Sequence, residues 1–171
     1  MKLFTLFAVA GLLTCMVSCA GSPSKRPKKI VVSCARGMLS EKAETVAVIP
    51  FDTSSSESQL NGRNIGALFA SLLGDLNYTV KDLDQPDREF KAGSAGLGQK
   101  LRKDILTGAA AKGIDGVVFG TAAVKQGNTV YTVYTVVLQS SASGKTLWTI
   151  VGENAAPREM IGRLKRRMYS R

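Results

Sequence analysis

The chain has 171 residues, of which 44% are hydrophobic and 21% are charged, and its formal net charge is +10. This length and composition are ordinary for one globular domain with a substantial core. The sequence contains no histidine, which excludes a Ser-His-Asp triad and every histidine-ligated metal site. We therefore expect no enzyme of the common acid–base type, no metal and no cofactor.

The first residues have the pattern of a bacterial lipoprotein export signal. Lys2 precedes an apolar stretch from Leu3 to Val17, and the small residue Ser18 stands before Cys19. An early cation, a short apolar core and a small residue at the cut are the parts of a secretory signal. We expect residues 1–18 to be removed and Cys19 to be acylated. An uncleaved anchor and an ordinary signal peptide are the alternatives, and a cut before Cys15 fits less well.

The residue after the expected lipidation site predicts the destination of the chain. Ala20 follows Cys19, and no aspartate stands there to retain the protein in the inner membrane. We expect a lipid-anchored protein on the periplasmic face of the outer membrane. With Cys15 removed and Cys19 acylated, Cys34 is the one free thiol, so no intramolecular disulfide is expected.

The positive charge lies in two flanks of the mature chain. Residues 30–157 contain 12 cations and 12 anions, which argues against a nucleic-acid-binding face spread over the fold. Residues 19–44 are interpreted as the lipidated N-terminus and a basic tether with a possible short strand. This tether either meets anionic lipid headgroups or is a solvated linker. The candidate membrane or partner contacts are Lys25, Arg26, Lys28, Lys29, Arg163, Lys165, Arg166 and Arg167.

Residues 45–171 are expected to form a single domain of five strands and three helices. Apolar runs indicate strands, and apolar residues three and four apart indicate helices. The expected strands are 46–51, 78–83, 116–124, 129–139 and 146–151. The expected helices are 59–76, a second one with Leu97, Leu101, Ile105 and Ala109 on one face, and a third that begins at Pro157. Polar loops are expected at 52–58 and 85–96, and turns at 127–128 and 140–144.

This β-α-β-α-β-β-β-α order predicts an α/β fold with a mixed five-stranded sheet and helices packed on it. Two helical crossovers make the first three strands parallel neighbours. Two hairpins then extend the sheet antiparallel. Val48, Ile49, Val118 and Phe119 are expected to be almost fully buried, and the stripe of the first helix is Ile65, Leu68, Phe69, Leu72, Leu73 and Leu76.

Several segments together resemble a known family of envelope lipoproteins. They are the run Val46–Phe51, the helix around 67–73, Tyr78–Val80, the stretch Ala109–Thr121 and the turn and strand Ser143–Trp148. In this order they are similar to the periplasmic α/β domain of the curli-secretion lipoprotein CsgG, the flagellar lipoprotein FlgO and the penicillin-binding-protein activator LpoB, a fold related to the N-terminal domain of TolB. The resemblance implies binding and assembly of an envelope complex, not catalysis.

Two functions follow as expectations. The first is a non-enzymatic, lipid-anchored module that binds a periplasmic or envelope protein belonging to cell-wall synthesis, the flagellum or secretion. The second is a subunit of a curli-type outer-membrane secretion channel. Tight turns at Gly127–Asn128 and Ser140–Gly144 leave no room for membrane-spanning strands of about 9–11 residues, which counts against a pore. The oligomeric state stays open.

The C-terminal helix has three competing interpretations. Its apolar stripe of Met160, Ile161, Leu164 and Met168 either packs on the sheet, lies on an anionic membrane or meets an acidic partner. Tyr131, Tyr134 and Trp148 lie on adjacent predicted strands and form either core pairs or a partner-binding patch. The glycine-rich segment 93–100 departs from a phosphate-binding loop, because its last glycine and its lysine are not adjacent.

Overall fold

The computed structural model describes residues 27–35, 43–53, 60–81, 99–126 and 129–170. The predicted signal and Cys19 lie outside these residues, as do the expected loop at 85–96 and the turn at 127–128. The elements in chain order are β1 (Lys29–Cys34), β2 (Thr45–Val48), β3 (Asp52–Thr53), α1 (Gly62–Leu73), the 3₁₀ turn η1 (Gly74–Leu76), β4 (Thr79–Lys81), α2 (Gln99–Ala111), β5 (Gly116–Lys125), β6 (Tyr131–Ser140), β7 (Thr146–Glu153) and α3 (Pro157–Tyr169).

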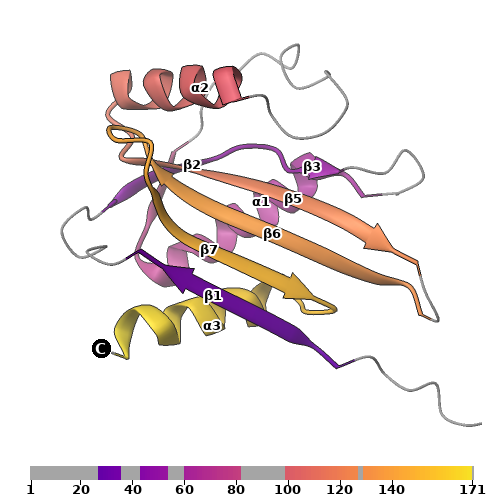
Figure 1. Cartoon of the computed structure of the whole chain (residues 1–171). Coiled ribbons are helices and arrows are strands. Elements are labelled where there is room, and N and C mark those ends of the chain that lie inside the picture. The colour runs from indigo at the N-terminus through magenta and orange to yellow at the C-terminus, as the bar shows by residue number, and fades with distance from the viewer. Residues whose placement is uncertain (1–26, 36–42, 54–59, 82–98, 127–128, 171) are drawn as a thin grey trace, which may run out of the picture.

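The strands form one mixed sheet in the order β1-β7-β6-β5-β2-β4, with β3 paired to β5 (Figure 1). β2 lies between β4 and β5 and is parallel to both, and β5, β6, β7 and β1 continue the sheet antiparallel. The predicted α/β class, the parallel trio and the two hairpins are confirmed. The expected number of strands was wrong, because the described sheet has seven.

Of the two additional strands, β1 is the possible short strand of the tether segment, and β3 comes from a segment interpreted as a loop. The apolar residues of β1 alternate, so Ile30, Val32 and Cys34 pack against the core while Val31 is half exposed. Asp52 and Thr53, expected in a polar loop, pair with β5 instead. Pro50 separates β2 from β3, because proline has no backbone N–H for the ladder. The backbone N–H of Phe51 accordingly donates to Gly62 O at 2.9 Å.

Helices cover the two faces of the sheet unequally (Figure 1). α1 and α3 pack side by side on one face, where they close the larger core. α2 covers β5 and β2 on the other face, through Ile105, Leu106 and Ala109. Gly113 ends α2 with a φ of +66°, the left-handed conformation expected after a helix. In the part of the chain that the structure describes, no helix lies over β6, β7 and β1 on the α2 side.

Two expected core positions are more exposed than predicted. Val48 is only partly buried, although it pairs with Val118 of β5 and packs against the larger core. Leu68 is 46% exposed, because it lies about 100° round α1 from Phe69, at the rim of the buried stripe. Ile49, Val118 and Phe119 are buried as predicted.

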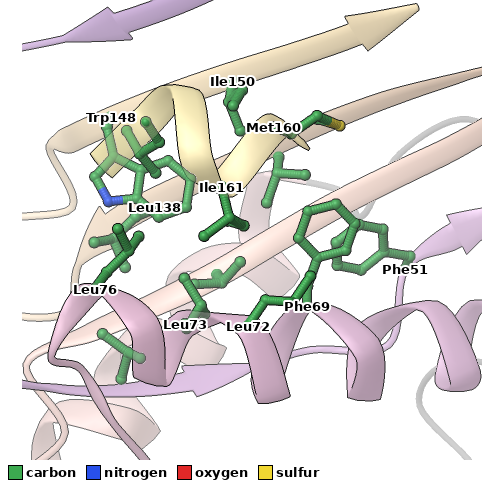
Figure 2. Close-up of a cluster of buried hydrophobic side chains, with 14 of the residues drawn as sticks. Phe51, Phe69, Leu72, Leu73, Leu76, Leu138, Trp148, Ile150, Met160 and Ile161 are labelled. Carbon is green, nitrogen blue, oxygen red and sulfur yellow. The ribbon is translucent and has the colours of Figure 1, made fainter. Parts of the chain in front are cut away.

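Aromatic packing fills the larger core where α1 crosses the sheet (Figure 2). Phe51 stacks on Phe69 with ring centroids 5.0 Å apart, and Tyr134 meets the Phe69 ring edge-on at 5.9 Å. The Phe51 ring lies directly against the backbone of Gly120, so that a Cβ at this position would collide with three of its atoms. Position 120 of β5 therefore requires glycine, because the Phe51 ring leaves no space for a side chain there.

Replacing Gly120 by alanine should lower the free energy of unfolding by about 1–3 kcal/mol, because the new methyl group overpacks the Phe51 site. Gly108→Ala is the matched control, since a Cβ on Gly108 meets nothing within 4 Å. That change should stabilise α2 by about 0.5–1 kcal/mol. Chemical denaturation of both variants measures the difference. An unchanged midpoint for Gly120→Ala would contradict the packing.

A buried polar pair fixes the other end of this core. Trp148 is fully buried, and its indole N–H donates to the Tyr78 hydroxyl at 3.1 Å. Tyr169 closes the same end, where its hydroxyl donates to Leu76 O and accepts from the Asn77 side-chain amide, each at 3.3 Å. Burial raises the pKa of Tyr78 above its ordinary value, and the hydrogen bond from Trp148 offsets part of that rise.

Replacing Tyr78 by phenylalanine should cost about 1–3 kcal/mol, because the buried indole N–H loses its acceptor. The raised pKa means that neutral Tyr78 stabilises the fold below pH about 10, and that this stability is lost as the pH rises through the pKa of Tyr78. Denaturation between pH 8 and 11 should therefore show a steeper alkaline loss in the wild type than in Tyr78→Phe. Equal slopes would rule out a titrating Tyr78.

Candidate interaction surface

The apolar side of α3 is fully used by the domain core. Pro157 occupies the first turn of the helix, and the Glu159 carboxylate accepts from the backbone N–H of Ala156 at 3.1 Å. Met160, Ile161 and Leu164 are at most 2% exposed (Figure 2 labels Met160 and Ile161). The prediction that this helix packs on the sheet is confirmed, and its apolar stripe is not available to a bilayer.

The opposite side of α3 presents cations to solvent. Arg163, Lys165, Arg166 and Arg167 are all exposed. Arg166 and Arg167 lie in the last turn, where positive charge interacts favourably with the helix dipole. Glu159 is the acidic residue of the first turn, so the negative charge lies near the N-terminus of the helix and the positive charges lie near its C-terminus.

An ion pair joins the tether to this helix. Lys28 Nζ lies 2.6 Å from Glu159 Oε1, between groups 131 residues apart in sequence. The hydrogen bond from Lys28 lowers the pKa of Glu159, and the bond from the backbone of Ala156 adds to the effect. Because Glu159, Arg163 and Arg167 are spaced by four, they share one face of α3. Lys28 therefore stands at the head of a row of cations that runs about 12 Å along the helix.

We call Lys28, Arg163, Lys165, Arg166 and Arg167 the basic strip. It brings together candidates that the sequence placed in two separate flanks. Lys29 is exposed beside it at the start of β1, where it pairs in register with Glu153. Lys25, Arg26 and the predicted lipidation site Cys19 lie outside the described residues.

The predicted aromatic patch does not form. Tyr134 and Trp148 belong to the core described above, as the alternative of cross-strand packing predicted. Tyr131 lies three residues before Tyr134 on the same strand, and alternation places their side chains on opposite faces of the sheet. Core packing therefore accounts for two of the three rings.

In the described segments, no group of three or more His, Cys, Asp or Glu residues is placed to hold a metal ion. Cys34 is not part of a disulfide and is partly buried. The buried Ser141 hydroxyl donates to Ile114 O at 2.6 Å and so holds the β6–β7 turn. None of the helices described is long and apolar enough to cross a membrane.

The comparisons with known proteins identify a fold. No protein-family model matches the chain, and no curated protein does. Two structures of the PelC dodecamer from Paraburkholderia phytofirmans are similar, at 14% identity and a TM-score of 0.51 for one, and 13% and 0.52 for a point variant. The first alignment covers 81% of this chain and 90% of PelC, and the second covers 85% and 100%. The chain therefore shares its fold with PelC.

The C-terminal domain of LpoB from Escherichia coli is also similar, at 17% identity and a TM-score of 0.48, over 67% of this chain and 84% of that domain. LpoB is one of the proteins that the sequence resembles, but a likeness of this size carries no conclusion about function. The resemblance to CsgG and FlgO remains a prediction.

The two sides of α3 should respond differently to substitution. Leu164→Ala should cost about 2–5 kcal/mol of stability, because it opens a cavity in the core. Arg167→Ala should change the free energy of unfolding by less than about 0.5 kcal/mol, since exposed residues away from special features contribute little. Urea denaturation of the two variants tests the docking of the helix. A small effect of Leu164→Ala would show that α3 does not close the core.

Proposed function

We propose that the chain is a non-enzymatic lipoprotein of the cell envelope, anchored through Cys19 to the periplasmic face of the outer membrane. It binds one protein of an envelope complex and regulates or assembles that complex. The basic strip carries this proposal. Its cations are held on a helix whose apolar side is buried in the core, so the partner meets a preformed charged surface.

The chemistry of the strip favours an acidic protein surface as its partner. A helix that lies in a membrane interface inserts its apolar side, and the apolar side of α3 is inside the domain. Arginine guanidinium groups form paired hydrogen bonds with carboxylates, and three of the four cations that α3 contributes to the basic strip are arginines. The candidate partners are a cell-wall synthase, a flagellar component and a secretion complex.

Site-specific photo-crosslinking in intact envelopes tests the strip. A crosslinker at Arg163 should capture a discrete envelope protein, and one at Lys103 on the exposed side of α2 should not. Charge reversal at Arg167 should weaken that capture at least about tenfold and leave the melting temperature unchanged. Equal capture from both positions would contradict a partner site on α3.

The anchor has its own test. Cys19→Ser should abolish fatty-acid labelling, and the labelled wild type should fractionate with the outer membrane. Continued labelling of Cys19→Ser would refute lipidation at this position. Fractionation with the inner membrane would refute the proposed location while leaving the anchor intact.

A second candidate function is a subunit of an oligomeric secretion assembly. The observation that favours it is the dodecameric state of both PelC structures with this fold. In the described sheet, β1 and β4 are open edges at opposite ends, and two different surfaces of this kind are what a ring of identical subunits requires. Light scattering on the full chain in detergent discriminates, because a stable ring supports this function and a monomer refutes it.

A further inference from the structure

One end of the sheet gathers features that the proposed partner site does not use. β1 begins there with Lys29, which pairs with the last residue of β7, Glu153. β5 ends there with Lys125, which pairs with the first residue of β6, Tyr131. In Figure 1 the start of β1 lies at the same end of the sheet as the end of β5.

Val130 is the most exposed large hydrophobic residue of the described chain, at 70%. It directly precedes Tyr131, so it lies beyond the last pair of the ladder between β5 and β6. Neither core cluster includes it. An exposed apolar residue at a protruding tip, next to an aromatic residue and a lysine, has the composition of a membrane-interface contact.

Three cations lie at the same end of the sheet as Val130. Lys29, Lys125 and Arg158 are exposed at the same end of the sheet. Of the carboxylates nearby, Glu159 is bound to Lys28, and Glu153 lies beside Lys29 in the register. Among the described residues, Lys125 and Arg158 therefore leave this end with a net positive charge. Such a surface is complementary to anionic lipid headgroups.

The length of the preceding chain keeps this end close to the bilayer. Lys29 follows Cys19 by ten positions, and ten residues span at most about 35 Å when fully extended. β6 alone is about 33 Å long at its ten residues, so the anchor is attached at the near end of the sheet, and the opposite end lies about one strand length further from it.

We infer that Val130, Lys125, Lys29 and Arg158 form a docking surface for an anionic lipid bilayer, the tether-side tip. The inference rests on the proposed anchor at Cys19, which brings the tip to the membrane. Val130 enters the headgroup layer while the cations contact lipid phosphates. The domain then stands on the membrane with the long axis of its sheet directed into the periplasm, and α3 runs from the membrane outwards.

Quenching by brominated phospholipid tests this arrangement in the full chain. Trp148 is fully buried, so the wild type should show almost no quenching in anionic vesicles and gives the baseline. Val130→Trp places an indole at the tip, and Leu68→Trp places one at a half-exposed site on α1 as the matched control. Quenching at position 130 should exceed that at position 68 at least about twofold. Equal quenching at both positions would overturn the proposal that the tether-side tip docks on the bilayer.

Charge reversal separates the tip from the basic strip. In the Val130→Trp chain, Lys125→Glu should reduce the quenching at least about twofold, and Arg163→Glu should leave it unchanged. Zwitterionic vesicles and high salt should reduce it as well, because the attraction is screened. If Arg163→Glu were the more damaging change, or if zwitterionic vesicles quenched equally, the docking surface would be wrong.

Co-flotation of the chain with the same vesicles tests the lipid anchor independently of the quenching. Flotation without selective quenching at position 130 would leave the anchor in place and refute the tip. Selective quenching without flotation would support the tip and refute the anchor. Loss of both would refute both.

Discussion

The domain depends on the burial of β5 on both of its faces. Val117 and Phe119 point towards α2, and Val118 and Ala122 point towards α1 and α3, each at most 2% exposed. β5 pairs with β2, β3 and β6, so it joins the parallel half of the sheet to the antiparallel half. The first four residues of β5 are buried, so this part of the strand has no solvent face that could tolerate a charge. Gly120, in the middle of β5, shows how closely the Phe51 ring approaches the strand.

The position of α3 follows from this central strand. The antiparallel half of the sheet needs a cover on the face where α1 packs, and α3 supplies it with Met160, Ile161 and Leu164. Gly152 on β7 allows the close contact, because a Cβ there would collide with the Met160 side chain. Because the apolar side of α3 is buried in this way, the side of the helix that remains exposed is the cationic one.

The ion pair between Lys28 and Glu159 contributes orientation more than stability. Both side chains are largely exposed, 59% and 42%, and exposed pairs contribute little to folding because water and salt screen them. The backbone ladder from β1 to β7 does the structural work of attaching the tether. Lys28 then extends the basic strip towards the end at which the tether leaves. Partner surface and tether-side tip are therefore neighbours on one molecule.

Local pattern determined much of this protein from the sequence alone. Apolar runs and helical spacing predicted the three helices, the parallel trio and the hairpins, since these depend on periodicity along the chain. The cations of the site could also be named, because their clustering in two flanks is visible in the sequence. Periodicity did not predict the division at Pro50, the exposure of Leu68 or the pairing of Asp52 and Thr53 with β5.

Only the tertiary structure decided how the distant pieces meet. Nothing near Lys28 in the sequence indicates that its partner is Glu159, because that contact exists only after β1 has paired with β7 and α3 has packed beside it. Val48 is part of a continuous apolar run, yet it is only partly buried in the folded domain. Hydrophobicity selects which residues seek burial, whereas the extent of neighbouring strands and helices determines which of them attain it.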